Sequence, residues 1–548
     1  MLFRFSRLAM PLAVRWVSLG LASAGLAGCG TTQAPQVDQP QAALSRPEPA
    51  TPPVSATPLS VESAAVAARF PDPEVSYRTP AFQESRTTFT TQAELQALMK
   101  KIASADGKDT PSAATLLTIG KSQSGVPIDA LVFTRHPNAK PATLLRGSRP
   151  TVLLIGQQHG DEPASAEALL VLAQELVAGG SQHSLLERIN VIVVPRANPD
   201  GAALQQSMTA NGIDINRDHL LLRTPEARAL AKLMQDFQPA VVLDSHEYAV
   251  QPLFVEKFGA AQRFDALMQY ATTMNEPEFV TKAAEEWFRR PMFAGLKPLG
   301  LTADWHHATS NALDDKKVSM GGVQPDVARN VIGLRNAVSL MVETRGVGLG
   351  TQHLKRRVQT QLSLMSTTLR SAADRAPDLM KLRQYVDNSV RAQACQGKMV
   401  VEASLSPSEY TLQMIDPATG ADKAVVVNWD SALVLADTKT RPRPCGYWLA
   451  ADQADAVSRL RALGVKVERF SDAAPVQADA APKGKAAKGF DAPVDSYYVP
   501  LSQPLGNLVV AALESKAAHG YLANGVVTAP DRIARVTTWP KGKRTPVP

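Results

Sequence analysis

Four short apolar runs constrain the fold of this 548-residue chain more than any other sequence feature. They alternate with two segments of helical periodicity, residues 164–177 and 225–237, each of which has a proline at or next to its first residue. The runs cover residues 152–155, 191–194, 241–243 and 340–342. Apolar runs of this length are typical of strands that are buried on both faces of a sheet. The pattern predicts an α/β fold with a mixed, mostly parallel sheet and helices on both faces.

The flanking segments extend this pattern. Residues 91–103 have helical spacing, and residues 116–120 and 128–133 are expected to form two strands joined by a turn. After about residue 370 the sequence changes character, and it predicts several strands and one helix, 451–463. The strands are expected at 398–401, 410–414, 424–427 and 465–467. This part of the chain is expected to be a second, smaller α/β or β-rich unit.

The length of the chain favours two folded domains with linkers. We expect a main domain over residues 61–370 and a C-terminal accessory domain over residues 371–548, with a low-complexity loop at 472–489 that is rich in Ala, Lys, Pro and Asp. Residues 29–60 are rich in Pro, Gln, Ala and Thr and cannot bury a core, so they are expected to form a tether.

The N-terminus predicts export. Arginines precede an apolar stretch at residues 8–21 that is too short for a comfortable membrane span, so residues 1–28 are expected to be a signal peptide. The ending Leu26-Ala27-Gly28-Cys29 resembles a bacterial lipobox, in which Cys29 would be lipidated. Because Gly30 follows, the expected location is the periplasmic face of the outer membrane, with a lipid anchor there. A plainly cleaved signal peptide, giving a periplasmic or secreted protein, stays open.

Cysteine count and charge add further limits. If Cys29 is lipidated, Cys395 and Cys445 remain, and they form either a disulfide or two buried thiols. The formal net charge is +7, without a run of Lys and Arg that is interleaved with aromatic residues. Nucleic acid is therefore not expected as a partner, and no motif implies a protein partner.

Residues that can carry chemistry follow the apolar runs. His159 and Glu162 come directly after the run at 152–155, and His246 ends the strand that begins at 241. Imidazole and carboxylate groups are ligands that zinc accepts, and active sites of open α/β sheets lie at strand ends. Either motif alone is more often a surface pair or a hydrogen-bonded structural histidine. A metal site at these residues therefore needs support from other residues of the sequence.

That support comes from three further segments. Asn198-Pro199-Asp200-Gly201 is a turn signal, and Asp214-Ile215-Asn216-Arg217 ends in a guanidinium that suits a carboxylate. Glu343 ends the apolar run at 340–342.

Taken in order, these motifs resemble the zinc metallocarboxypeptidase family (M14 type), over about residues 91–350. Residues 333–338 resemble the last helix of that family. The resemblance implies that one Zn²⁺ ion is held by His159, Glu162 and His246, with Glu343 as the general base. It also implies that Asn216 and Arg217 bind the terminal carboxylate of a peptide substrate, and that Asp214 orients His159.

Some positions depart from the family pattern. No arginine lies in residues 205–210, where the pancreatic-type enzymes have one that stabilises the developing oxyanion, and Gln206 offers only a neutral hydrogen bond. Trp305, His306 and His307 lie where the family has a substrate-capping tyrosine. Arg329 lies where the family builds its side-chain pocket, and it either favours an acidic end residue or forms a structural ion pair, for example with Asp326.

The sequence therefore predicts a hydrolase that cuts the C-terminal peptide bond of substrates with a free carboxylate, in the bacterial envelope. Two alternatives remain. One is a zinc amide deacylase of the aspartoacylase type, and the other is a catalytically weak peptide-binding protein on the same fold. Zinc content separates the last alternative from the other two functions, and product identity separates the peptidase from the deacylase.

Overall fold

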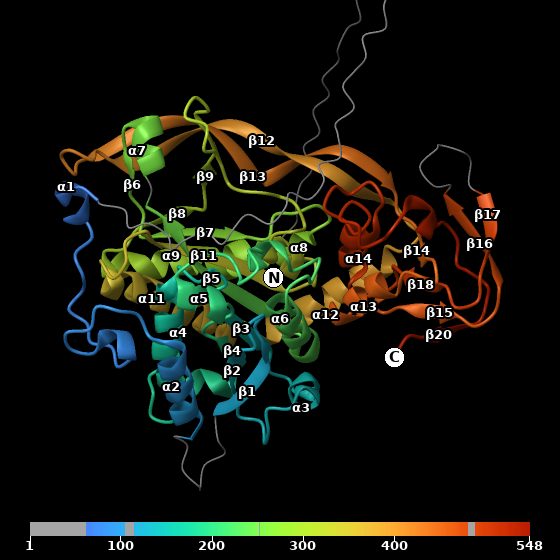
Figure 1. Cartoon of the computed structure of the whole chain (residues 1–548), viewed down its shortest axis with the longest axis horizontal. Coiled ribbons are helices and arrows are strands. Elements are labelled where there is room, and N and C mark those ends of the chain that lie inside the picture. The colour runs from blue at the N-terminus through green and yellow to red at the C-terminus, as the bar shows by residue number, and fades with distance from the viewer. Residues whose placement is uncertain (1–61, 105–113, 251, 480–487) are drawn as a thin grey trace, which may run out of the picture. The chain divides into compact units, whose positions relative to one another are not determined.

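An eight-stranded mixed sheet lies at the centre of the chain (Figure 1). The computed structural model describes residues 62–104, 114–250, 252–479 and 488–548, so the predicted signal peptide, Cys29 and the whole predicted tether lie outside the described residues. In sheet order, the strands are β1 (Ala114–Lys121), β2 (Pro127–Phe133), β4 (Asn190–Val194), β3 (Thr151–Gly156), β5 (Val241–Ala249), β11 (Val338–Val347), β7 (Ala266–Tyr270) and β8 (Ala303–Trp305).

The four apolar runs form the four middle strands of this sheet, β4, β3, β5 and β11. These strands pair in parallel with one another, whereas β1–β2, β2–β4 and β11–β7 are antiparallel pairs. Every residue of β3 and β4 is buried, as expected for strands that are covered on both faces. The predicted mixed, mostly parallel sheet is confirmed.

Helices cover both faces of the sheet. Val152 and Leu154 of β3 pack into one core with α4 (Pro163–Leu176) and α11 (Leu354–Asp374). Leu153 and Ile155 point to the other face, where they share a core with α6 (Pro225–Phe237) and α10 (Ala328–Gly333). Because successive strand residues point to opposite faces, one apolar run supplies both cores.

The remaining helices surround these layers and extend into the later part of the chain. They are α1 (Ala64–Ala67), α2 (Gln92–Ser104), α3 (Pro141–Arg146), α5 (Pro199–Leu204), α7 (Pro252–Phe258), α8 (Glu278–Ala283), α9 (Arg290–Leu296), α12 (Ala376–Ala392), α13 (Ala454–Ala462) and α14 (Gly506–Leu513). Among the described residues, no helix combines the length and apolar character that crossing a membrane requires.

Two further sheets contain the strands that follow residue 370. One has the order β6 (Ala261–Gln262), β12 (Lys398–Ile415), β13 (Asp422–Pro442), β10 (Lys317–Ser319) and β9 (Ala308–Thr309). The long β12–β13 ribbon of this sheet is prominent in Figure 1. The other has the order β17 (Lys488–Ala492), β16 (Ala474–Asp479), β19 (Ile533–Val536), β14 (Gly446–Leu449), β18 (Tyr497–Pro500), β15 (Glu468–Phe470) and β20 (Arg544–Pro546).

Residues on both sides of position 370 share structure. The ribbon pairs with β6 and β10, which precede that position, and α13 and α14 share a core with α6. The described residues all belong to one compact unit, and position 370 lies inside α11. The division into a main and an accessory domain stays a prediction.

Several predicted elements differ from those in the structure. The helix expected at 333–338 is wrong, because α10 ends at Gly333 and a turn with Asn336 at φ 61° leads into β11 at Val338. The segments 398–401 and 410–414 belong to one strand, β12. Residues 465–467 precede a strand rather than form one.

The loop expected at 472–489 is also partly wrong. Residues 474–479 form β16 and residue 488 begins β17, and these strands pair antiparallel. Residues 480–487 lie outside the described residues. In β16, buried Ala and Val residues alternate with more exposed residues, so one face of the strand is buried. The high content of Ala, Lys, Pro and Asp in the whole segment obscured this alternation in the sequence.

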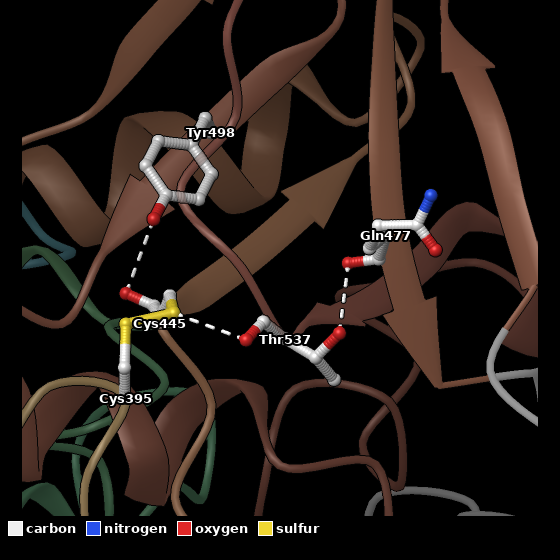
Figure 2. The surroundings of a disulfide bond; sticks show 5 residues. All are labelled: Cys395, Cys445, Gln477, Tyr498 and Thr537. Atoms are coloured by element: carbon white, nitrogen blue, oxygen red, sulfur yellow. Dashed lines mark hydrogen bonds between the residues drawn. A yellow bond between two sulfur atoms is a disulfide. The ribbon is translucent and has the colours of Figure 1, made fainter.

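Cys395 and Cys445 form a disulfide, which Figure 2 shows with its surroundings. The bond joins the chain just after α12 to the residue before β14, so it closes the base of the β12–β13 ribbon. The Tyr498 hydroxyl donates to the Cys445 carbonyl at 3.1 Å. The disulfide therefore fixes the ribbon to the sheet that contains β14 and β18.

Candidate metal and substrate site

The three predicted metal ligands meet at the C-terminal ends of β3 and β5. The chain leaves β3 at Gly156, turns through Gln157 at φ 48°, and places Glu162 as the residue before α4. His246 lies on β5 and is 1% exposed. One potential ligand atom from each of His159, Glu162 and His246 lies within 4.8 Å of the other two.

Both imidazoles point the same ring atom at the Glu162 carboxylate. His159 Nδ1 lies 2.7 Å from Glu162 Oε1, and His246 Nδ1 lies 2.8 Å from Glu162 Oε2. The Nε2 atom of each ring faces a different carboxylate. His159 Nε2 lies 3.1 Å from Asp214 Oδ1, and His246 Nε2 lies 2.9 Å from Asp244 Oδ2. An Nε2–H that donates to a carboxylate leaves the Nδ1 lone pair free for a cation.

The electrostatics of this cluster favour a positive charge at its centre. Burial acts against charge here, yet Glu162 and Asp214 raise the pKa of His159 to about 10. Against the same burial, Asp244 and Glu162 raise the pKa of His246 well above its usual value. The two histidines in turn lower the pKa of Glu162 to about 2 although burial raises it. Two imidazole nitrogens with raised pKa values and a carboxylate that stays ionised are a donor set that fits Zn²⁺.

A buried polar network behind His246 was not predicted from the sequence. Asp244 is 1% exposed and accepts hydrogen bonds from Gln158 Nε2 at 2.7 Å to both carboxylate oxygens. Gln158 Oε1 in turn lies 2.8 Å from Nε2 of the buried His219. The signal for Asp244 was present in the sequence, because residues two apart on a strand share a face and Asp244 lies two positions before His246.

Glu343 lies directly beside His246. The two residues are paired across the parallel strands β11 and β5. The Glu343 side chain is 17% exposed, and its Oε1 lies 3.5 Å from Nε2 of His306. Burial lowers the pKa of His306. The register thus brings the predicted general base to the edge of the cluster, and His306 adds a neighbour that the sequence could not place.

Asn216 and Arg217 have different environments. Asn216 is buried: its Nδ2 lies 3.3 Å from His246 Nε2, and its Oδ1 accepts from the Ala328 amide at 3.1 Å. Arg217 is exposed, and its side chain makes one hydrogen bond, to the Asn216 carbonyl at 3.5 Å. Asn216 therefore fixes local geometry, whereas the Arg217 guanidinium is available to an anion.

Arg329 lies in the same neighbourhood and is 3% exposed. Burial, then the charge of Arg217, lower the pKa of Arg329 to about 10, while Glu343 acts in the opposite direction. The Arg329 Nη2 donates to the Gly322 carbonyl at 3.0 Å, and its Nε has no partner within the described residues. An ion pair with Asp326, one of the two alternatives for Arg329, is absent from the described chain, and Asp326 instead pairs with His519 at 2.8 Å.

Gln206 is not brought to the cluster. Its side chain donates to the Thr209 carbonyl at 3.5 Å, inside its own turn. In the described part of the chain, no hydrogen bond joins it to a metal-ligand residue. Tyr248 also points elsewhere, since its hydroxyl donates to the Phe264 carbonyl.

Part of the chain is similar to known carboxypeptidases. Residues 96–313 match the family model described as zinc carboxypeptidase. Carboxypeptidase 2 of Trichophyton rubrum is 29% identical over 332 residues, which cover 60% of this chain and 61% of that protein. Carboxypeptidase E of Caenorhabditis elegans is 33% identical over 144 residues, 23% of this chain and 29% of that protein. This chain thus aligns with less than two thirds of the length of these relatives.

Among solved structures, a metallo-carboxypeptidase from Pseudomonas aeruginosa has a TM-score of 0.39 and 19% identity, covering 53% of this chain and 69% of the other. That similarity is too low to add to the argument. The family match contains His159, Glu162, Asn216, Arg217 and His246, and it supports a metallocarboxypeptidase domain. Glu343 lies beyond the matched residues, so its assignment depends on its register beside His246.

Proposed function

We propose that this protein is a zinc-dependent carboxypeptidase that removes residues from the free C-terminal end of peptides. The observation that carries the proposal is the convergence of two Nδ1 atoms on the Glu162 carboxylate, with Glu343 paired beside His246. The matches to zinc carboxypeptidases over residues 96–313 support the same reaction class.

The metal would be held by the Nδ1 atoms of His159 and His246 and by the carboxylate of Glu162. When bound, zinc supplies Lewis-acid chemistry that polarises a carbonyl group and makes water more acidic. Asp214 and Asp244 hold the rings by accepting from the Nε2 atoms, which keeps the Nδ1 lone pairs directed at the shared centre.

Glu343 performs the proton transfers of the reaction. Its carboxylate takes a proton from the attacking water and delivers it to the nitrogen of the leaving amine, so that the peptide bond breaks and an amino acid leaves. Its position on β11, one strand away from His246, puts it within reach of a scissile bond at the cluster. Burial holds His306, at 3.5 Å, mainly neutral, so it does not neutralise this carboxylate.

Two arginines recognise the end of the substrate. Arg217 is exposed and has no carboxylate partner in the described chain, so it can bind the terminal carboxylate as a fork. Arg329 is buried close to it, and no carboxylate of the described residues forms an ion pair with it. We propose that Arg329 binds the side-chain carboxylate of the last residue, which gives a preference for peptides that end in Asp or Glu.

The test of the reaction uses zinc-loaded protein and a mixed peptide pool in which each peptide has a free or an amidated C-terminus. We expect mass spectrometry to show loss of single residues from the free ends only. Glu343→Gln should keep zinc and lower kcat by about 10²–10⁴-fold, the usual contribution of a general base. His159→Ala should lose zinc. If zinc-replete protein trims nothing, or trims amidated ends equally, the carboxypeptidase assignment is wrong.

The end preference is tested separately with Arg329→Met, which keeps an unbranched apolar stem and removes the charged guanidinium. We expect the ratio of kcat/KM for Glu-ended over Leu-ended peptides to fall by about tenfold or more, the equivalent of one charged hydrogen bond. An unchanged ratio would assign Arg329 a structural role.

We also propose that the protein is exported and anchored to the outer membrane through a lipid on Cys29. A disulfide between Cys395 and Cys445 supports an oxidising compartment. Labelling with a radioactive fatty acid should mark the protein, whereas Cys29→Ser should stay unlabelled and be released from membranes. Equal membrane retention of both forms would exclude this anchor.

A further inference from the structure

A basic cavity of about 520 Å³ lies at the end of the main sheet opposite to the candidate metal site. Val242 of β5 and Ala337, just before β11, line it. Four residues of strand, about 13 Å, separate Val242 from His246 along β5. The other walls come from α6, α12 and two segments of the later chain, 463–466 and 503–505.

Four cationic side chains line this cavity: Arg335, Arg383, Arg391 and Lys466. Arg335 is the most enclosed, with 7% exposed, and its Nη1 donates to the Leu463 carbonyl at 2.9 Å. The Nε and Nη2 atoms of Arg335 have no hydrogen-bond partner within the described residues. Because Arg335 lines the cavity and these two donors have no partner in the described chain, they are available to a ligand that enters it.

The charges of the cavity are not balanced by its own carboxylates. Asp387 lies 3.6 Å from Arg383 Nε, and Asp236 pairs with Lys232 outside the cavity lining. In the described chain no carboxylate lies within 4.0 Å of Arg335, Arg391 or Lys466. Burial, then the nearby Arg383, lower the pKa of Arg335 to about 10, so Arg335 is still charged at neutral pH.

From this arrangement we infer that the cavity binds a small molecule through a phosphoryl group. Arginine forks match phosphate oxygens, and a dianion balances more of the uncompensated charge than a single carboxylate does. The cavity is larger than one phosphate, so it has room for the group to which the phosphate is attached. The ligand would connect Arg335, in the turn between α10 and β11, with Lys466 of the later chain. This site does not depend on the proposed peptidase activity.

The test measures binding of inorganic phosphate to the full chain by calorimetry and by thermal unfolding. An Arg217→Gln background keeps the substrate-carboxylate arginine from contributing. We expect saturable binding and a rise in Tm with phosphate but not with chloride at equal ionic strength. Arg335→Gln should weaken the phosphate Kd by about tenfold or more, the effect of losing one charged hydrogen bond.

A second pair of variants avoids the buried position. Lys466 and Lys381 are both exposed, but only Lys466 lines the cavity, and Lys381 lies on α12 two residues before Arg383. Lys466→Gln should weaken phosphate binding, whereas Lys381→Gln should not. Absence of saturable binding, equal Kd values for these two variants, or tighter binding of malonate than of phosphate would overturn the inference.

Discussion

At the scale of single residues, the histidine ligands depend on the groups behind them. Asp244 accepts from His246 Nε2 and is itself held by Gln158, which keeps its two oxygens in place. Burial raises the pKa of Asp244, but His246 and Gln158 lower it below its usual value overall. Asp244 therefore carries a negative charge that holds one tautomer and one ring orientation of His246.

Asp244→Asn tests this role. An amide keeps the shape of the side chain but removes its charge, and it can present an N–H to the ring in place of an acceptor. We expect zinc affinity to fall by about 10–100-fold, as is usual for such supporting partners. A competitive chelator titration followed by metal analysis measures it. The control is Gln206→Ala, since Gln206 lies outside the cluster, and equal affinity in both variants would contradict the role.

At the scale of elements, a buried ion pair connects β5, α4 and α11 next to the candidate metal ligands. Arg357 of α11 donates to both oxygens of Glu247, at 2.8 and 2.9 Å, and Glu247 also accepts from the Ala164 amide in the first turn of α4. Both partners are at most 3% exposed. Gly346 of β11 leaves room for the pair, because a Cβ there would overlap Glu247 Oε1.

Gly346→Ala should therefore displace the ion pair and destabilise the protein. We expect the free energy of unfolding to fall by about 3–5 kcal/mol, the cost of disrupting a buried pair. Denaturant unfolding measures it. Gly322→Ala is the control, because an added Cβ at that position meets nothing within 4 Å. Equal stability of the two variants would show that β11 can shift away from Glu247.

At the scale of the whole molecule, the later part of the chain reaches the residues that we propose to bind substrate. His519 pairs with Asp326 at 2.8 Å, just before α10 and close to Arg217 and Arg329. The hydrogen bond that His519 Nδ1 donates to Asp326 raises the pKa of His519 above 6.5. Burial raises the pKa of Asp326, but His519 outweighs it and lowers that pKa below 3.8. The pair keeps Asp326 from neutralising the two arginines.

The stability that this pair supplies has a defined pH dependence. The His519 contribution is complete below pH 6.5 and is lost as the pH rises through the folded pKa, whereas the Asp326 contribution is present above pH 3.8. His519→Gln should therefore lower Tm more at about pH 5.5 than at about pH 9, where the imidazole is largely neutral. Thermal unfolding of both proteins at both pH values measures this. An equal loss at both values would mean that the hydrogen bond, and not the charge, stabilises the contact.

The sequence alone determined the middle of the sheet and the order of its chemistry. The runs at 152–155, 191–194, 241–243 and 340–342 are apolar throughout, and only strands covered on both faces bury such runs completely. The resemblance of the ordered motifs to the zinc metallocarboxypeptidase family implied that His159, Glu162 and His246 lie near one another, and the structure brings them together.

Other features depended on contacts between residues that are far apart in the chain. The buried polar residues of α11, among them Arg357, Thr360 and Gln361, make its sequence resemble a surface segment, so neither this helix nor α12 was predicted. The separation of Arg329 from Asp326 was likewise not encoded locally, because it depends on His519, almost 200 positions later. Periodicity and strand ends are local properties and can be read from the sequence. Partners of buried charges are chosen by tertiary packing, and only the structure decided them.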